Sequence, residues 1–337
     1  MNVVEGALLG GRYRLDRELG RGGMGEVWAA VDEQGGRRVA VKLLLEASGV
    51  FDVDGYRRFE REAQTVRALS HPNIVTCWAF EAPANEPAFM VMELLEGESL
   101  RDRISRERLD VPAAVAVMLQ VTSALEAVHA VGIVHRDVKP ANVFCCANGV
   151  VKVLDFGVLK LVDESGSSFS RSGLLVGTPG YMAPEQIRGE LVTPRTDVYA
   201  CGVCLFEMLT GVLPFDGRGA SLLARVRDGT PRRADALARH VPRSLADVVD
   251  RALAPDPRDR HGSMAELTAA LAGAEVAPGT MRLPGAPPLP LSASPTEPAP
   301  TVLAASGRGH ADATVLQSSP PDAPLEPTLR SPRGRSG

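Results

Sequence analysis

A glycine-rich segment at residues 19–27 constrains the fold of this chain more than any other feature. It contains the pattern G-x-G-x-x-G at Gly20, Gly22 and Gly25. In dinucleotide-binding domains such a loop opens a helix, whereas the alternating residues 27–31 that follow here are typical of a strand. The segment is therefore predicted to be a strand–turn–strand flap over phosphate groups, and a glycine-rich hairpin without a ligand is the alternative.

Further alternation indicates that the first hundred residues form mainly strands. Apolar residues recur at every second position in 27–31 and again in 39–43, with the turn signal Gln34-Gly35-Gly36 between them. On a strand over 39–43, Ala40 and Lys42 share one face. Lys42 would then lie beneath the glycine flap, where its ammonium group can bind phosphate oxygens, and a solvated strand lysine is the alternative.

A carboxylate on the helix predicted over residues 56–69 is the expected partner of Lys42. Glu62 lies within the apolar stripe of that helix, three residues after Phe59. Burying an unpaired carboxylate is costly, so the pattern predicts an ion pair between Glu62 and Lys42. A solvated Glu62 at the edge of the stripe is the alternative.

Two polar loops further along the chain carry side chains suited to phosphate chemistry. Each follows a short apolar stretch that is predicted to be a strand: Asp137, Lys139 and Asn142 follow residues 133–134, and Asp155 follows residues 150–154. One carboxylate can accept a proton, a second carboxylate together with an amide oxygen can hold Mg²⁺, and an ammonium group can neutralise phosphate.

Together with the glycine loop and Lys42, this order of residues resembles the eukaryotic-type protein kinase family, most closely its bacterial Ser/Thr kinases. The resemblance covers about residues 12–272 and includes Ala183-Pro184-Glu185. It implies an α+β, two-lobed protein kinase fold, with a small β-rich N-lobe at about 12–95 and a larger α-helical C-lobe at about 96–272. The implied function is ATP-dependent phosphorylation of Ser or Thr on protein substrates.

The resemblance also implies a role for each residue of the site. Asp137 would orient the substrate hydroxyl and accept its proton, and Lys42, held by Glu62, would bind the α- and β-phosphates. The implied catalytic residues are Asp137, Lys139, Lys42 and Glu62, and the implied Mg²⁺ ligands are Asn142 and Asp155. The implied ATP contacts are Leu19, Gly20, Arg21, Gly22, Gly23, Met24, Gly25, Glu26, Val27, Ala40, Lys42, Met92, Glu93, Leu95 and Phe144.

Substrate choice and regulation are implied by the same resemblance. Lys139, together with Thr178 ahead of the Ala-Pro-Glu, accompanies Ser/Thr specificity in the family. Arg136 beside the catalytic aspartate is typical of kinases controlled by phosphorylation of the activation segment, and Ser170 and Ser172 are the expected sites. Self-association would allow one molecule to phosphorylate another.

An ion pair and a buried helix start are also expected in the larger lobe. The resemblance pairs Arg260 with Glu185 and places Asp197 at the start of a buried helix. The spacing Cys201-Gly-Val-Cys204 superficially offers a redox or zinc site, but in a buried helix both residues are predicted to be small core side chains, as is the adjacent pair at 145–146.

Composition excludes several other classes of protein. With 337 residues, 45% of them hydrophobic, the chain can bury a sizeable core, and its net charge of −4 argues against nucleic-acid binding. Residues 113–134 are the most apolar stretch but are interrupted by polar residues, so no membrane span is predicted. The absence of a visible secretory signal and an odd count of five cysteines indicate a reducing, cytoplasmic location.

Two terminal segments are predicted to lie outside the kinase domain. Residues 273–337 hold 13 of the 26 prolines and no aromatic residue, so this Pro/Ala/Ser-rich tail is predicted to be disordered. Residues 1–11 are interpreted as an N-terminal extension.

Two other functions are compatible with parts of this pattern. A pseudokinase-like scaffold would bind nucleotide without transferring phosphate, but such proteins usually lack one of the residues matched here by Lys42, Asp137, Asn142 and Asp155. A kinase of small molecules would generally lack the long activation segment and the Ala-Pro-Glu.

Overall fold

The computed structural model divides the chain into two compact units, Met1–Pro290 and Leu291–Gly337. All described residues belong to the first unit, and they are 4–22, 25–44, 69–83, 86–155 and 178–274. The helix predicted over 56–69 falls almost wholly outside this part of the chain, and so does the predicted tail from residue 275 onward.

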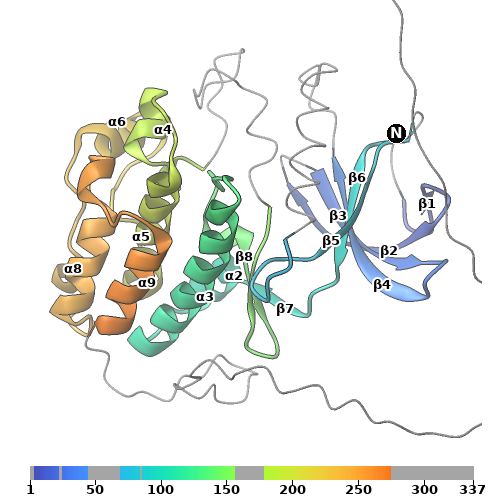
Figure 1. Ribbon diagram of the computed structural model, residues 1–337, viewed down its shortest axis with the longest axis horizontal. Coiled ribbons are helices and arrows are strands. Elements are labelled where there is room, and N and C mark those ends of the chain that lie inside the picture. Colours follow the sequence, from blue (N-terminus) through green and yellow to red (C-terminus); the bar gives the residue numbers. More distant parts are fainter. Residues whose placement is uncertain (1–3, 23–24, 45–68, 84–85, 156–177, 275–337) are drawn as a thin grey trace, which may run out of the picture. The chain divides into compact units, whose positions relative to one another are not determined.

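The N-terminal part of the first unit is built on an antiparallel sheet, drawn in blue to cyan in Figure 1. Among the described residues its strands lie in the order β1-β2-β3-β4-β6-β5. Their bounds are Leu8–Leu9 (β1), Tyr13–Gly22 (β2), Gly25–Asp32 (β3), Arg37–Leu44 (β4), Cys77–Glu81 (β5) and Phe89–Glu93 (β6). The sheet confirms the predicted β-rich N-lobe.

Two hairpins connect β2, β3 and β4. Gly22 of β2 lies opposite Gly25 of β3, so the glycine loop is the turn between two antiparallel strands. The next hairpin pairs Asp32 with Arg37, and its turn contains Gly36 with a φ of +65°, a conformation that glycine adopts without a Cβ clash. The strand–turn–strand prediction and the predicted turn are both confirmed.

The two faces of β4 bury different side chains. Val39 and Val41 face the core of the sheet, whereas Ala40 and Lys42 face the opposite side, where Ala40 packs with Met92. The alternation predicted for this strand is therefore correct. The sheet core consists of Leu9, Tyr13, Leu15, Trp28, Ala30, Val39, Val41, Leu43, Phe89 and Val91.

The sheet begins upstream of Arg12. Leu8 lies opposite Arg14 and Leu9 opposite Tyr13, so residues from the predicted N-terminal extension add an edge strand. Leu9 is only 4% exposed and belongs to the sheet core. A strand of two residues has no periodicity to reveal it in the sequence.

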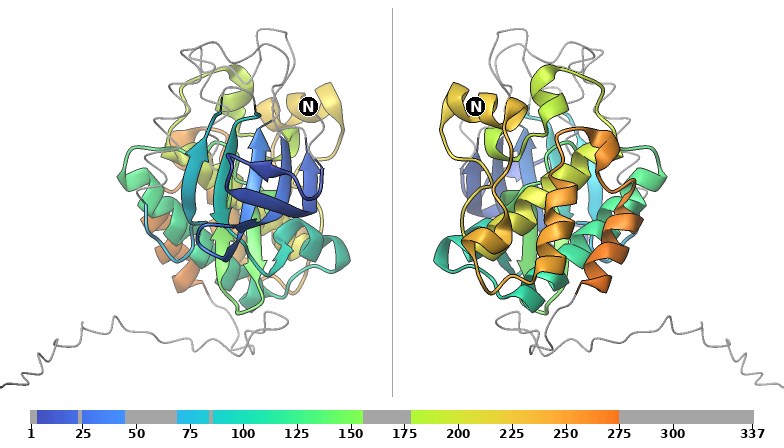
Figure 2. Two further views of the ribbon diagram at one scale, coloured as in Figure 1. Left: turned by 90° about the vertical axis from the view of Figure 1, so that its right-hand side faces the viewer. Right: turned by 90° about the vertical axis from the view of Figure 1, so that its left-hand side faces the viewer.

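The C-terminal part of the unit is mainly helical, as Figures 1 and 2 show. The helices are α2 (Leu100–Arg106), α3 (Val111–Ala130), α4 (Pro184–Arg188), α5 (Pro194–Thr210), α6 (Gly219–Asp228), α7 (Ala234–Leu237), α8 (Arg243–Ala252) and α9 (Met264–Gly273). A small antiparallel sheet of β7 (Gly97–Ser99), β8 (Val143–Cys146) and β9 (Val151–Val153) accompanies them, with single 3₁₀ turns at Pro140–Asn142, Pro179–Tyr181 and Pro257–Asp259. The predicted α-helical C-lobe is confirmed.

Local capping explains where α3 begins and where α5 ends. Asp110 precedes α3, and its side chain accepts a hydrogen bond from the Ala113 amide, which satisfies one free donor of the first turn. Gly211 ends α5 in the left-handed conformation with a φ of +79°, and its amide donates to the carbonyl of Glu207. α5 packs against both α3 and α8.

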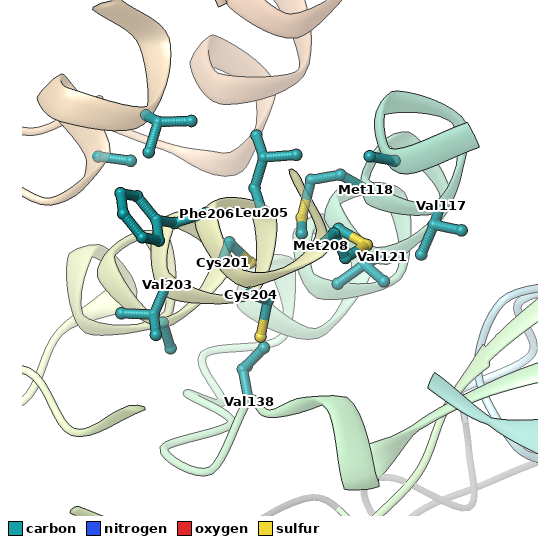
Figure 3. Close-up of a cluster of buried hydrophobic side chains, with 14 of the residues drawn as sticks. Val117, Met118, Val121, Val138, Cys201, Val203, Cys204, Leu205, Phe206 and Met208 are labelled. Carbon is teal, nitrogen blue, oxygen red and sulfur yellow. The ribbon is translucent and has the colours of Figure 1, made fainter. Parts of the chain in front are cut away.

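The contact between α3 and α5 forms a buried apolar cluster, part of which is drawn in Figure 3. Cys201 and Cys204 lie inside it, and Val138 points up from the loop below toward Cys204. Burial raises the pKa of both thiols, and both cysteines are free. The C-x-x-C pair therefore packs as core side chains, as predicted.

Helix α3 is long and apolar enough to pass a length-and-composition test for a membrane span. However, 67% of its most apolar window is buried inside the unit. Its packing against α5 and α9 is that of a core helix in a globular domain.

The close approach of α5 to α8 predicts that Gly202→Ala destabilises the fold. A Cβ at residue 202 would lie 2.8 Å from the Cβ of Ala252 and 3.2 Å from Leu253. Overpacking costs ~1–3 kcal/mol, which exceeds the gain of at most ~1 kcal/mol in helix propensity. We expect a net loss of ~1 kcal/mol in the free energy of unfolding, measured by urea titration.

The matched control is Gly273→Ala at the end of α9. A Cβ there meets no atom within 4 Å, so this variant should be neutral or slightly stabilising. Equal effects of the two alanines would contradict the packing argument.

Candidate active site

The loop that carries Asp137 is held by a buried carboxylate rather than by a strand. The strand predicted at residues 133–134 is absent from the structure. Instead, the amides of His135 and Arg136 donate to the two carboxylate oxygens of Asp197 at 2.8 and 2.9 Å, and His129 Nε2 lies 2.7 Å from the same carboxylate. Because the side chain of Asp197 satisfies these amides, the segment needs no neighbouring strand.

Two residues of the site adopt a backbone conformation that is unfavourable for L-amino acids. Arg136 has a φ of +63° and Asp155 a φ of +47°, and among the described residues they are the only non-glycine residues in this region. Such residues persist only where the surroundings hold them, and they concentrate at functional sites.

Asp137 lies at the centre of a hydrogen-bonded group. Lys139 Nζ is 2.8 Å from Asp137 Oδ2, and Asn142 Nδ2 donates to the same oxygen at 3.1 Å and to the Asp137 carbonyl at 2.9 Å. These contacts fix the carboxylate of Asp137 in one orientation. The structure thus brings together three of the residues assigned to the site.

Lys42 forms an ion pair with Asp155. Its Nζ lies 2.6 Å from Asp155 Oδ1, and the Lys42 side chain is only 10% exposed. Within the sheet Lys42 lies directly opposite Val27, two residues after the last glycine of the G-x-G-x-x-G pattern. The predicted partner Glu62 lies outside the described residues, and the pairing with Asp155 was not foreseen from the sequence.

A third lysine pairs with the segment that connects the two lobes. Lys152 Nζ lies 2.6 Å from Glu93 Oε1 and donates to the carbonyl of Ile74 at 3.2 Å, while the Thr76 amide donates to the same Glu93 oxygen at 2.7 Å. Glu93 was predicted only as an ATP contact. Its side chain in fact links β6 to β9.

An apolar cluster faces Lys42 from the same side of the sheet. It contains Val27, Ala40, Met92 and Leu95, all of which were predicted to contact ATP. The remaining members, which the sequence did not indicate, are Val75, Met90, Leu94 and Leu154. Phe144, also predicted to contact ATP, is half-buried on β8 opposite Ser99 and is not a member of this cluster.

The glycine hairpin is braced by charged side chains. Arg21 lies 3.2 Å from Glu18 and 3.0 Å from Glu26 on the opposite strand. Glu26 is buried and also accepts a hydrogen bond from the Trp28 indole. Leu19 and Gly20 belong to β2, whereas Gly23 and Met24 lie outside the described residues.

Asn142 and Asp155 have the chemistry of a Mg²⁺ site. The Leu154 amide donates to the Asn142 carbonyl at 2.8 Å, which places Asp155 next in the chain beside Asn142. Because Asn142 Nδ2 faces Asp137, its Oδ1 is directed away from that residue and can serve as a ligand. One carboxylate and one amide oxygen fit a hard cation that keeps several waters.

Helix α4 is anchored by a buried ion pair. Arg260 donates to both oxygens of Glu185 at 2.8 Å, as predicted, and Thr196 donates to Glu185 at 2.8 Å. Burial alone would raise the pKa of Glu185, but the hydrogen bonds and charge of Arg260 outweigh it, and the pKa lies below its ordinary 4.5.

The predicted regulatory residues are only partly described. The buried Nε of Arg136 has no hydrogen-bond partner in the part of the chain that the structure covers. Thr178 is exposed. Ser170 and Ser172 lie outside the described residues.

The site thus combines a glycine hairpin, a sheet lysine paired with Asp155, and a hydrogen-bonded carboxylate at Asp137. This arrangement is typical of proteins that bind nucleotide phosphates and transfer a phosphoryl group. The chain belongs to the protein kinase family, because the family model described as "Protein kinase domain" matches residues 13–271.

Relatives of this chain carry the names of bacterial Ser/Thr kinases. This chain is 41% identical over 269 residues to the serine/threonine-protein kinase PknB of Mycobacterium tuberculosis. The match covers 78% of this chain and 43% of the relative. It is 38% identical over 270 residues to PknA of the same organism, covering 78% of this chain and 61% of the relative. The chain thus spans about two to three fifths of the length of these relatives.

A solved structure shows the same fold. The crystal structure of the kinase domain of Mycobacterium tuberculosis PknI, determined for a mutant form, superimposes with a TM-score of 0.64 at 28% identity. The match covers 80% of this chain and 98% of that domain.

The buried ion pair predicts a pH-dependent defect in Arg260→Met. This variant leaves the buried Glu185 carboxylate with Thr196 but without its charge partner, which should lower the free energy of unfolding by ~3–5 kcal/mol at pH 7. The low pKa of Glu185 stabilises the wild type above pH 4.5, and this contribution is lost as the pH falls through the folded pKa. The deficit of the variant should therefore shrink in acid, measured by urea unfolding at pH 7 and pH 4.

The control is Arg258→Met, which makes the same change at an arginine that is 86% exposed and paired with Asp256. Surface ion pairs contribute little, so its unfolding curve should stay near that of the wild type. A deficit in Arg260→Met that is unchanged or larger in acid would contradict the assignment of a buried, ionised Glu185.

Proposed function

We propose that this chain transfers the γ-phosphoryl group of ATP to Ser and Thr hydroxyl groups of protein substrates. The observation that carries the proposal is the group around Asp137: its carboxylate is fixed by Lys139 and Asn142. An oriented carboxylate can accept the proton of a substrate hydroxyl, and a neighbouring ammonium group can neutralise charge on the transferred phosphoryl group. The names of the relatives support Ser and Thr as acceptors.

The remaining residues are suited to binding and orientation. Lys42 would meet phosphate oxygens as a point charge, beneath a hairpin whose glycines leave backbone amides free to approach the triphosphate. Asn142 and Asp155 would hold Mg²⁺, which when bound neutralises charge on the phosphates. The cluster of Ala40 and Met92 offers an apolar surface to the adenine base.

The arrangement favours an active kinase over a pseudokinase-like scaffold. Lys42, Asp137, Asn142 and Asp155 are not only present but already connected by ion pairs and hydrogen bonds. A scaffold needs none of this geometry. The bacterial origin of the relatives supports a bacterial signalling role, and five free cysteines support a reducing, cytoplasmic location.

Regulation by autophosphorylation, through self-association of two molecules, is part of the proposal. The buried Nε of Arg136, which has no hydrogen-bond partner among the described residues, is suited to a phosphorylated side chain, because a guanidinium group binds phosphate strongly. Ser170 and Ser172 are the proposed acceptors, and Thr178 is proposed to contribute to Ser/Thr specificity.

Asp137→Asn should abolish phosphate transfer while leaving nucleotide binding intact. Loss of the proton acceptor is expected to lower the rate by about 10²–10⁴-fold, since the amide cannot take the hydroxyl proton. The measurement is incorporation of label from γ-labelled ATP with Mg²⁺ into the chain itself and into casein, with sites mapped by mass spectrometry. Asp216→Asn, at an exposed ion pair with Arg232, is the control and should retain full activity.

Equal labelling of wild type and Asp137→Asn would contradict the assigned role of Asp137. Bound nucleotide without label on any protein would favour the scaffold. Transfer to a small hydroxyl compound but not to protein would favour the small-molecule kinase.

Ser170→Ala/Ser172→Ala should reduce activity toward casein by about tenfold or more if phosphate at these positions pairs with Arg136. Autophosphorylated wild type is compared with the double variant and with wild type treated with a phosphatase. The double variant and the phosphatase-treated wild type should have equally low activity toward casein. Full activity of the double variant would show that the switch lies elsewhere.

A further inference from the structure

Gln186, in the short helix α4, makes hydrogen bonds in two directions. It is only 6% exposed. Its Nε2 donates to the carbonyl of Arg136 at 3.1 Å, and its Oε1 accepts from the amide of Ala183 at 3.0 Å. The side chain therefore connects the start of α4 to the catalytic loop, fifty residues earlier in the chain.

The orientation of this amide is determined by its two neighbours. The Ala183 amide can only donate, and the Arg136 carbonyl can only accept. Rotating the side-chain amide by 180° would place two donors together at Ala183 and two acceptors together at Arg136. Only a glutamine in the observed orientation satisfies both groups, whereas a glutamate or a leucine cannot do so at neutral pH.

The bond to Arg136 holds the peptide group that leads directly into Asp137. The carbonyl of Arg136 and the amide of Asp137 belong to one planar unit, so fixing the carbonyl fixes the plane. Arg136 has the strained φ of +63°, and its own amide is held from the other side by Asp197 at 2.9 Å. The left-handed residue is thus held at both of its peptide groups.

Helix α4 is itself firmly placed. Glu185, next to Gln186, is bonded to Arg260 and Thr196. Just upstream, the hydroxyl of Tyr181 donates to Glu207 of α5. Movement of residues 181–186 would therefore be transmitted through Gln186 to the peptide before Asp137. Among the described residues, Gln186 provides the side chain of α4 that bonds to this peptide.

We propose that Gln186 is a positioning residue that couples the segment leading into α4 to the orientation of Asp137. It acts through the backbone of Arg136 and touches neither nucleotide nor substrate. The inference rests on the proposed kinase function, since its consequence for catalysis is the placement of Asp137. No sequence pattern predicted it, because the role depends on a contact between residues far apart in the chain.

The test compares Gln186→Leu with Gln120→Leu. Leucine at 186 removes the hydrogen bonds to Arg136 and Ala183 while keeping a side chain of similar size. We expect kcat to fall about 10–100-fold through misplacement of Asp137. KM for ATP should stay unchanged, since Gln186 contacts neither Lys42 nor the apolar cluster around Ala40. Gln120 is the matched control: it is half-buried and hydrogen-bonded to Asn73 and the Val151 amide, away from the catalytic loop.

A second variant separates positioning from loss of folding. In Gln186→Glu a protonated carboxyl can donate to the Arg136 carbonyl, whereas an ionised one cannot. The kcat of this variant relative to wild type at the same pH should therefore rise about tenfold or more as the pH falls from 8 to 6. Using the ratio cancels pH effects that are common to both proteins.

Hydrogen exchange provides a readout that does not depend on activity. The amide of Asp137 should exchange about tenfold faster in Gln186→Leu than in wild type, and no faster in Gln120→Leu. If wild type transfers no phosphate, the proposed function fails, but faster exchange at Asp137 would still support the coupling. A wild-type kcat in Gln186→Leu, a loss no larger than that in Gln120→Leu, a pH-independent ratio for Gln186→Glu, or unchanged exchange would each overturn it.

Discussion

The candidate site depends on the hydrogen bonds of the Asp197 carboxylate. It is fully buried in the first turn of α5, where the helix dipole favours negative charge, and it binds two consecutive backbone amides and His129. A buried carboxylate without such partners would be strongly destabilising. The bonds therefore stabilise the fold and, by the same geometry, hold Arg136 in its left-handed conformation. Stability of the C-lobe and the shape of the catalytic loop are consequences of one interaction.

Lysines mark the functional part of the molecule. The chain has only four among its 37 basic residues, and each of the three that the structure describes pairs with a carboxylate of the site: Lys42 with Asp155, Lys139 with Asp137, and Lys152 with Glu93. The buried structural pair uses Arg260 instead, whose planar group binds both oxygens of Glu185. A lysine holds its partner with a single ammonium group and exchanges it for a phosphate oxygen more readily than a bidentate arginine does.

The parts of the fold that depend on local sequence could be predicted, and the parts that depend on distant contacts could not. Alternation placed Lys42 and Ala40 on one face of β4, and the glycine pattern indicated the hairpin before β3, because both are set by neighbours in the chain. The apolar pair at 133–134 was mistaken for a strand, since the amides of the next two residues, His135 and Arg136, bond to a side chain on α5 instead of a neighbouring strand. The side-chain link from Glu93 to Lys152 was likewise invisible, because periodicity says nothing about which charged residues meet.

Strand β9 and the two residues after it take part in most contacts of the candidate site. Val153 exchanges hydrogen bonds with Asn73 and Val75, Lys152 binds Glu93, and the Leu154 amide binds Asn142. Asp155, one residue further on, is thus tied by the backbone to Asn142 and through it to Asp137, whereas it meets Lys42 only through side-chain atoms. A displacement of the N-terminal sheet would therefore change the contacts of Lys42 with Asp155 and of Glu93 with Lys152. The hydrogen bonds that join Asn142 to Asp137 and to the Leu154 amide involve no residue of that sheet. The proposed proton acceptor and the proposed oxygen ligands thus belong to one framework, whereas the contribution of Lys42, the proposed phosphate-binding residue, depends on the position of the sheet.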